Sequence, residues 1–418
     1  MTHDHRIPTT APHARTESEV PGQRRALVAI ALSQLLALTL WFSASAVAPQ
    51  LEDLWQLTGG QTAGLTLAVQ IGFVVGALGS AIFNIADIVP SRRLFVYSAI
   101  AGLTANAALT LLNAGDIAIA TGLRFLTGVA LAGLYPSGLK VMSGWFTRKR
   151  GMALGVLVGA LTVGSATPHL IRGIGFDWRG VVLAASVMAG VAAVIMALAV
   201  HDGPYETNPQ RFSWSQIGRV VSNRGVRLST YGYLGHMWEL YAMWTWTAAF
   251  LAASSEAAGI SYGSVPVITF FVVAIGGLGA WLAGRWADRF GRTLVAGGSM
   301  AVSGACAAVT PVIFGASPIV VIPVFLVWGF AVVADSAQFS TMVTETADDS
   351  LRGTALTLQT AIGFLLTLVT IRGVPVLAEA WSWQWAFPVL ALGPALGVVA
   401  MVLLKRSPIS AQLAGGRG

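Results

Sequence analysis

Long apolar runs separated by short polar breaks extend from Ala26 to Leu404, and they constrain the fold more than any other feature of the sequence. A helix that crosses a bilayer needs about 20 mostly apolar residues, and each run is long enough. Charged residues make up only 10% of the chain, against about 25% in a typical soluble domain. The sequence therefore predicts an all-α polytopic membrane protein with twelve transmembrane helices. The expected spans are residues 26–49, 63–85, 94–113, 116–142, 152–173, 180–200, 228–252, 264–286, 293–314, 318–343, 352–375 and 384–404.

The distribution of basic residues predicts the orientation of these spans. With the N-terminus inside, the inner segments hold 21 of the 25 Lys and Arg residues. Cytoplasmic loops are enriched in these residues, so both termini are expected in the cytoplasm and the chain in the inner (cytoplasmic) membrane. The basic residues are dispersed between apolar runs, which argues against a nucleic-acid partner. The expected partners are the lipid bilayer and a small-molecule solute, and the protein is expected to be a monomer.

Five segments are expected along the chain. Residues 1–23 are polar and read as a disordered cytoplasmic tail. Residues 24–200 form an N-terminal six-helix bundle, and residues 228–405 form a C-terminal one. Residues 201–227 read as a cytoplasmic linker with a short surface helix, which a capping-box pattern at Ser213 and Gln216 would begin. Residues 406–418 are a second cytoplasmic tail.

The two bundles repeat one another. Ala86-Asp87 recurs as Ala287-Asp288, Gly76 as Gly277 and Gly128 as Gly329, all at an offset of 201 residues, and Arg150-Gly151 recurs as Arg352-Gly353 at an offset of 202. Two six-helix halves in parallel orientation are one architecture of secondary transporters, whose solute site lies between the halves near the bilayer midplane.

Two motifs carry a family resemblance. The run from Gly284 to Arg292 resembles the loop signature G-x-x-x-D-R-x-G-R of the major facilitator superfamily, and Arg124 to Gly128 is similar to that family's R-x-x-x-G motif. The resemblance covers nearly the whole chain and implies two pseudo-symmetric halves that rock around a central cavity lined by spans one, four, seven and ten. The first-half copy of the loop signature is degraded, with Ile88 in place of Arg and Pro90 in place of Gly.

The loop signature supplies the candidate gating residues. Asp288 follows a helix end, where it can meet Arg292 or the N-terminus of a neighbouring helix in a pair that breaks as the halves move. Gly284 is expected to permit close approach and Gly291 a tight turn. A solvated loop whose charges only set the orientation is the alternative. The candidate gating residues are Asp288, Arg289, Arg292, Gly284 and Gly291, together with Asp87, Arg92 and Arg93 of the first half.

Four ionisable residues fall inside the expected spans: Arg124, His236, Glu239 and Asp335. A charge at bilayer depth costs roughly 2.5 to 3.5 kcal/mol on insertion scales, so each is a functional candidate. Glu239 is the first candidate for the coupling proton, with His236 as its partner on the same helix face. Asp335 is the second candidate for proton coupling and lies closer to the inner gate. A fixed structural ion pair is the alternative.

Arg124 and the mid-span aromatic residues are candidates for solute binding. The planar guanidinium of Arg124 suits a solute carboxylate or could modulate a nearby carboxyl group, whereas structural pairing with Asp335 is the alternative. Trp41 and Trp244 offer large surfaces with one polar atom each. The expected solute site consists of these three residues and His236. The stripe from His236 through Glu239 and Met243 is expected to face the cavity.

These features predict a secondary active transporter that uses the proton gradient, with no catalytic residues, no metal and no other cofactor. Arg124 favours uptake of a small organic anion by symport. Gly155 and Gly164 match the spacing of the family's antiporter motif, but Pro168 lacks the preceding Gly, which also favours uptake. The alternative is a proton-coupled antiporter that exports amphiphilic or cationic compounds, which Glu239, Asp335 and the 14 Trp residues would suit.

Two readings outside transport carry less support. An intramembrane enzyme would need a clustered nucleophile and base or a metal set, and no such motif surrounds His169 or His236. A G-x-x-x-x-G-K-[ST] nucleotide loop is also missing from the sequence. A sensor that keeps the bundle would be expected to carry a signalling domain, and the expected tails are too short for one.

Overall fold

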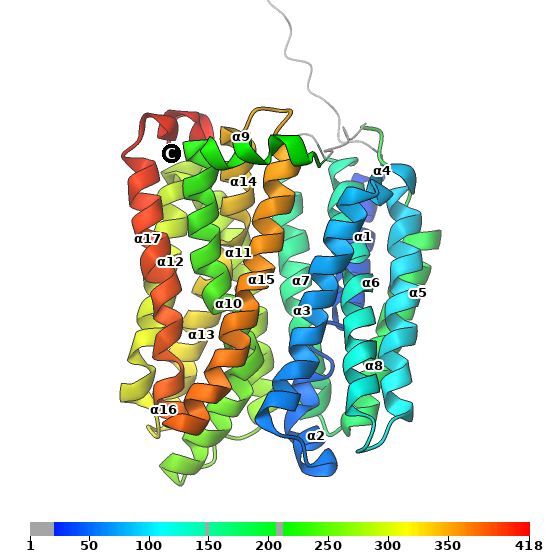
Figure 1. Cartoon of the computed structure of the whole chain (residues 1–418), viewed down its shortest axis with the longest axis vertical. Helices are drawn as coiled ribbons and strands as arrows, with labels where there is room; N and C mark the ends of the chain where they lie inside the picture. Colours follow the sequence, from blue (N-terminus) through cyan, green and yellow to red (C-terminus); the bar gives the residue numbers. More distant parts are fainter. Residues whose placement is uncertain (1–20, 147–149, 206–211) are drawn as a thin grey trace, which may run out of the picture.

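The computed structural model describes residues 21–146, 150–205 and 212–418, and the regular elements in these ranges are all helical. They form two bundles that lie side by side, one from α1 to α8 and one from α10 to α17 (Figure 1). The elements of the first bundle are α1 Gln23–Leu38, η1 Ser45–Val47, α2 Ala48–Trp55, α3 Gly59–Ile82, α4 Ile85–Ile88, α5 Ser91–Ala108, η2 Leu109–Leu111, α6 Ile117–Ser143, α7 Arg150–Gly173 and α8 Trp178–Leu198. Those of the second are α10 Arg224–Ala258, α11 Val265–Phe290, α12 Arg292–Ile313, α13 Pro318–Ala334, α14 Ser336–Thr346, α15 Arg352–Ala380, α16 Trp383–Ala386, η4 Pro388–Ala391, α17 Leu392–Lys405 and η5 Pro408–Gly415.

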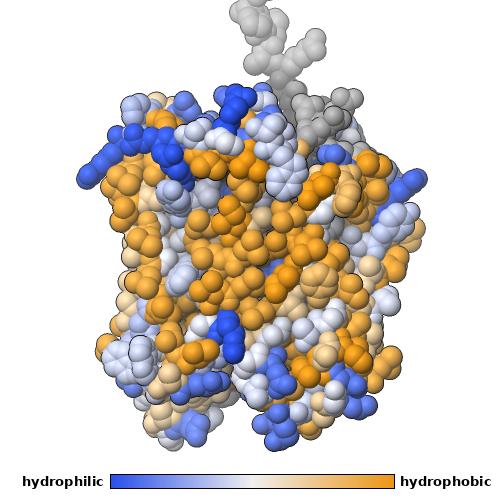
Figure 2. Space-filling view, in the orientation of Figure 1, coloured by the Kyte–Doolittle hydropathy of each residue, from blue (hydrophilic) through white to orange (hydrophobic). Residues whose placement is uncertain are grey.

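Within the described residues, ten helices are long and apolar enough to cross a membrane. The expected first and seventh spans are not among them. The first span is interrupted, because α1 has only 16 residues and ends at Leu38. The seventh corresponds to α10, which has 35 residues but carries Glu239 and many polar side chains. Both helices lie inside the bundles, so the arrangement fits the twelve-helix fold. An apolar band crosses the visible face between more polar ends (Figure 2), as a membrane-spanning protein requires.

The two ends of the bundles carry different short elements. The upper end in Figure 1 carries α4, α9 (Ile217–Ser222) and the C-terminus, and the lower end carries α2 and α16. The linker helix expected after Ser213 is present as η3 (Trp214–Gln216) and α9. The expected capping box is absent, since the Ser213 hydroxyl pairs with Ser215 and the Gln216 side chain accepts a hydrogen bond from Thr354.

Glycines explain how closely the helices of each bundle pack. A side chain at Gly128 in α6 would collide with the Val69 carbonyl of α3, and a side chain at Gly329 in α13 would collide with the Val272 carbonyl of α11. These two glycines are related by the sequence repeat. The repeat therefore preserves the same backbone contact in both bundles, because only glycine leaves room for it.

The bundles meet along two pairs of helices. In one pair, a Cβ at Gly159 in α7 would lie 3.6 Å from the carbonyl oxygen of Gly277 in α11. In the other, α3 packs on α15, where the rings of Phe73 and Phe364 lie 4.4 Å apart. The α3–α15 contact continues to the lower end, where a Cβ at Gly60 would lie 3.0 Å from Arg372. The groups at the centre of the interface are consequently buried.

Candidate solute and coupling site

The break in the first transmembrane segment positions one part of the site. Residues 39–44 form turns between α1 and η1, and all of them are buried. A helix that stops inside a bundle leaves carbonyl groups without intrahelical partners, and in a membrane these groups need donors from the protein. The break also turns two large aromatic residues, Trp41 and Phe42, into the core.

Arg124 supplies donors to this break. Its Nη2 donates to the Trp41 carbonyl (2.6 Å), and its Nη1 donates to the Leu40 carbonyl (3.1 Å). The same Nη1 lies within hydrogen-bond distance of Ser43 Oγ (3.0 Å) and Asn106 Oδ1 (2.9 Å). The side chain is fully buried. Arg124 thus binds neutral groups of its own bundle. Both Nη atoms have partners there without either of the ionic partners that the sequence predicted, a solute carboxylate or Asp335.

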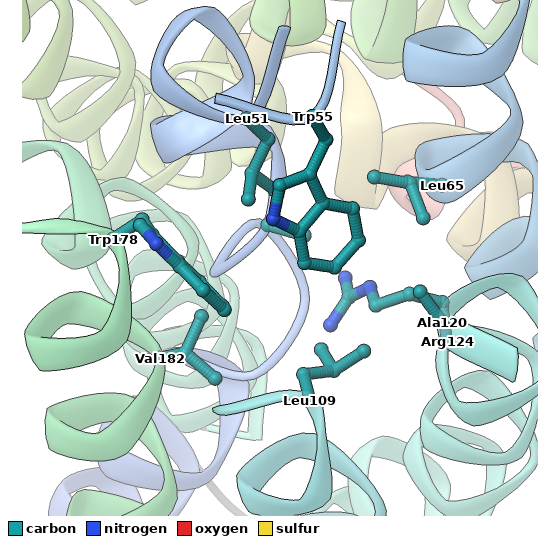
Figure 3. A pocket seen from close by; sticks show the side chains of 9 residues that line it. Leu51, Trp55, Leu65, Leu109, Ala120, Arg124, Trp178 and Val182 are labelled. Carbon is teal, nitrogen blue, oxygen red and sulfur yellow. The ribbon is translucent and has the colours of Figure 1, made fainter. Parts of the chain in front are cut away.

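An apolar hollow lies on the other side of Arg124. Trp55, Trp178 and Leu109 line it together with the Arg124 side chain (Figure 3). The rings of Trp55 and Trp178 meet edge to face at 5.5 Å. The Nε of Arg124 has no hydrogen-bond partner in the described structure. The hollow lies within the first bundle and is separate from the interface between the bundles.

Aromatic rings from four segments meet at the interface. The Trp41 ring lies 5.0 Å from Phe73 of α3, 5.6 Å from Tyr241 of α10 and 5.7 Å from Phe364 of α15. Trp244 joins them, 5.7 Å from Tyr241. We call these five residues and Phe42 the central aromatic cluster. The structure brings together two of the residues expected to bind solute, Trp41 and Trp244, but Arg124 contacts only the backbone of this cluster.

The side chains of α10 divide between two faces. Tyr241 follows Glu239 by two positions, which at 100° per residue places it about 200° around the helix. Tyr241 faces the central aromatic cluster, whereas Glu239 faces α12 and α13 of its own bundle. The expectation that the stripe through His236 and Glu239 faces the cavity is therefore wrong. The spacing placed these residues on one face correctly, but the rotation of the helix about its axis depends on packing that the spacing does not contain.

Both carboxyl oxygens of Glu239 accept hydrogen bonds. Trp328 Nε1 donates to Oε1 at 2.6 Å, and Ser303 Oγ donates to Oε2 at 2.8 Å. Glu239 is 1% exposed. Sequence reasoning missed both donors, because nothing in the sequence marks Ser303 or Trp328 as facing a carboxyl group.

His236 pairs with Asp335, whereas the sequence predicted that it would pair with Glu239. The Nδ1 of His236 lies 2.8 Å from Oδ1 of Asp335, and both side chains are buried. Asp335 lies between α13 and α14, at the point where the expected tenth span is interrupted. The Phe339 ring covers His236 at 5.7 Å. Two separate polar groups, Glu239 with its donors and His236 with Asp335, therefore lie within the second bundle.

The predicted gating residues of the second half lie at the upper end. Arg292 Nε donates to both oxygens of Glu345, at 2.9 and 2.8 Å, and its Nη1 donates to Gln338 at 3.2 Å. Asp288 lies 3.6 Å from Arg292, as expected, but its side chain is 70% exposed. Glu345 is thus the stronger partner. Sequence reasoning missed it, although an acid at the end of the tenth span was an available signal.

The C-terminal segment, residues 407–418, covers this group. The Ala414 backbone N–H donates to Glu345 Oε2 at 3.2 Å, and Arg417 Nη1 donates to the Asp288 carbonyl at 2.6 Å. Gly291 has a φ of 97° and approaches the Arg417 backbone closely, which confirms the expected tight turn. Gly284, in contrast, has open space where its side chain would be, so the expected close approach there is wrong.

The remaining gating candidates form no shared group with these residues. Arg289 lies over the Phe290 ring at 5.1 Å. Arg92 Nη1 donates to the Val200 carbonyl at 2.7 Å, which joins α5 to the end of α8, and Arg93 is exposed. The Asp87 side chain is outside the part of the chain that the structure describes.

Comparison with known proteins agrees with this architecture. The sequence matches the Major Facilitator Superfamily over residues 30–371. The chain belongs to the major facilitator superfamily. Its members are transporters, so membership makes this chain a multi-pass membrane transporter rather than an enzyme. No curated protein matches the sequence.

Solved structures of this superfamily resemble the chain in fold. One is the crystal structure of a point mutant of the nucleoside transporter NupG, with a TM-score of 0.68 and 12% identity over 91% of this chain and 100% of that one. Another is a bacterial homologue of the human lysosomal transporter Spinster, in an inward-facing and occupied conformation. It has a TM-score of 0.68 and 14% identity over 93% of this chain and 98% of that one. At these identities the likeness concerns the fold alone.

Proposed function

We propose that this superfamily member is a proton-coupled secondary transporter that takes up a small organic solute by alternating access between its two bundles. The observation that carries the proposal is the set of buried ionisable side chains in the second bundle, Glu239, His236 and Asp335. A buried charge in a membrane protein is costly and usually marks an ion pathway or a proton relay. Three such groups in one bundle favour ion coupling.

The position of Asp335 supports a link between proton binding and gating. It joins α13 to α14, and one turn later Gln338 accepts a hydrogen bond from Arg292 at the upper end. A change in the protonation of the His236–Asp335 pair would alter the force on the start of α14. Because α14 also carries Glu345, that change would reach two of the side-chain partners of Arg292, Gln338 and Glu345. The proposal assigns coupling to Glu239 and Asp335 and gating to the Arg292 group.

The proposal places the protein in the cytoplasmic membrane with both termini in the cytoplasm. The upper end, which carries the C-terminus, would then face the cytoplasm. Basic residues on this end include Arg92, Arg289, Arg352 and Arg406, as the enrichment of cytoplasmic loops requires. The solute remains a small organic compound, and the preference for an anion loses its support because Arg124 is committed to the α1 break.

A proton-flux assay tests this proposal. Purified protein is reconstituted in liposomes that enclose a pH-sensitive dye, and three solute pools are added outside: planar aromatic carboxamides, the matching carboxylates and the matching amidines. Symport acidifies the interior as solute and proton enter together, whereas antiport makes the interior more alkaline. Protein-free liposomes give the baseline for passive permeation.

Substitution on a single helix provides the control. We expect one pool to acidify the interior with the wild type and with Glu256→Gln, which changes an exposed acid on α10. Glu239→Gln should abolish that acidification. Alkalinisation would establish export instead, and equal proton entry in Glu239→Gln and wild type would remove Glu239 from the coupling mechanism. No protein-dependent proton movement with any pool would contradict proton-coupled transport of these compounds.

A further inference from the structure

We infer that the central aromatic cluster, with Gln70, is a binding site for an uncharged planar solute that accepts hydrogen bonds. This inference rests on the proposed transport function and names the class of solute for it. The cluster lies between the two bundles, with Trp41 and Phe73 from the first bundle and Tyr241 and Phe364 from the second. A solute bound there would touch both bundles at once.

Buried polar atoms without partners are the first argument. Within the described residues, the indole Nε1 of Trp41 and of Trp244 has no hydrogen-bond partner, and the same holds for both amide atoms of Gln70. Trp41 and Trp244 are each 1% exposed, and Gln70 is fully buried. Buried polar groups are nearly always hydrogen-bonded, and each buried donor or acceptor without a partner costs about 1–3 kcal/mol. A bound solute would satisfy these groups.

The positions of these atoms are the second argument. Gln70 precedes Phe73 by three positions on α3, so both side chains lie on the same helix face. Phe73 contacts Trp41, and Tyr241 contacts both Trp41 and Trp244. The unpartnered groups therefore belong to the ring cluster itself or share a helix face with one of its rings. Three of them, the two indoles and the Gln70 NH₂, are donors, so they require acceptor atoms on the solute.

The charges of the surroundings are the third argument. Ionisable side chains of both bundles engage neighbours of their own bundle: the Nη atoms of Arg124 donate to the α1 break, Glu239 accepts from Ser303 and Trp328, and Asp335 pairs with His236. An ionised solute among these rings would have to lose its hydration without direct contact with an opposite charge, which is costly. A neutral solute has no such cost.

The ring geometry supplies the shape. Ring centroids in the cluster lie 4.4–6.2 Å apart, within the range of stacked and edge-to-face aromatic pairs. A planar ring can replace one of these contacts when the bundles separate, whereas a puckered ring of equal size cannot stack. The cluster therefore favours a flat aromatic solute over an aliphatic one.

The test measures binding to purified full-length protein in detergent, without any gradient. Thermal stability is recorded with benzamide, with the isosteric ions benzoate and benzamidine, and with cyclohexanecarboxamide, which keeps the amide but loses the flat ring. We expect benzamide and its bicyclic carboxamide analogues to stabilise the protein more than the other three compounds at equal concentration. Titration calorimetry with the best carboxamide then gives its dissociation constant.

Matched variants locate the site. Trp41→Phe keeps an aromatic ring, although a smaller one, and removes one donor, so it should weaken carboxamide binding about 2- to 12-fold, and Gln70→Met should weaken it by a similar or larger factor. Trp55→Phe makes the same change outside the cluster and should leave binding unchanged. If Trp41→Phe fails to fold, Trp244→Phe replaces it.

Each outcome is decisive. Stabilisation by benzoate or benzamidine equal to that by benzamide would overturn the neutral class, and equal stabilisation by cyclohexanecarboxamide would overturn the planar one. No stabilisation by any carboxamide, or equal affinity in wild type and both cluster variants, would overturn the site. Proton flux that depends on Glu239 but is driven by carboxylates would refute this inference and leave the proposed function intact.

Discussion

Glu239→Gln should remove coupling and leave the fold nearly unchanged, because the local hydrogen bonds can rearrange around the amide. Trp328 Nε1 can only donate, so the amide oxygen must take the place of Oε1. The amide NH₂ then points at Ser303 Oγ, which now donates to Glu239 at 2.8 Å and lies 3.2 Å from the Met300 carbonyl. Ser303 can accept from the amide and donate to Met300. Both contacts are kept.

The magnitude follows from this count of hydrogen bonds. Two charge-assisted bonds become two neutral ones, each weaker by about 1 kcal/mol. The neutral amide costs less to bury than the carboxylate, and this gain offsets most of the loss, so the free energy of unfolding should change by no more than about 1 kcal/mol. Trp328→Phe, in contrast, deletes one donor to a buried carboxyl group and should cost about 1.5–3 kcal/mol. At about 2–4 °C per kcal/mol for a unit the size of one bundle, Tm should fall by at most about 4 °C for Glu239→Gln and roughly 3–12 °C for Trp328→Phe.

The assay combines thermal unfolding in detergent with the proton-flux measurement in liposomes. We expect Glu239→Gln to be folded and uncoupled. The reasoning is refuted if Glu239→Gln unfolds at a lower temperature than Trp328→Phe, since the amide would then not fit between its two donors. It is refuted equally if Glu239→Gln still acidifies the liposomes at the wild-type rate.

Three further substitutions test the structural reasoning. Gly329→Ala should lower Tm by more than about 5 °C or prevent folding, because its side chain would meet a backbone carbonyl, whereas Gly298→Ala enters open space and should change Tm little. Arg124→Met removes the donors to the carbonyls of the α1 break and should cost about 1–3 kcal/mol for each group left unsatisfied, so a Tm equal to that of the wild type would contradict the clamp. Glu345→Gln should release the C-terminal segment, seen as faster amide hydrogen exchange there; unchanged exchange would show that Arg417 and the buried Leu413 hold the segment without it.

The sequence predicted the fold well because its signals are one-dimensional. Apolar run length, basic residues in the breaks and glycines at a fixed offset require no knowledge of neighbours. Gly128 and Gly329 show this: the repeat identified them, and the structure shows the backbone contact that requires glycine at both. The break at residues 39–44 was missed, since an apolar run reads the same whether its helix continues or stops.

The sequence predicted which ionisable residues are buried but not which partners their side chains face. Arg124, His236, Glu239 and Asp335 are buried within the bundles as expected. Their partners depend on the rotation of each helix and on side chains from segments far away in sequence. His236 and Glu239 lie three positions apart, yet His236 reaches Asp335, 99 positions along the chain, and Glu239 reaches Ser303 and Trp328.

The two faces of α10 suggest how solute and proton can influence each other without touching. Tyr241 and Trp244 face the central aromatic cluster, while Glu239 and its donors lie on the opposite side of the same helix. A rigid helix that rotates to open the cluster must also move Glu239 relative to Ser303 and Trp328, which are held on α12 and α13. Opening would lengthen the two hydrogen bonds to the carboxyl group, and protonation would lower the cost of that lengthening. Coupling of this kind needs only one helix with two arrangements that both ligands bias. It is also reciprocal: the factor by which a solute that holds the cluster open changes the proton affinity of Glu239 must equal the factor by which protonation of Glu239 changes the affinity for that solute.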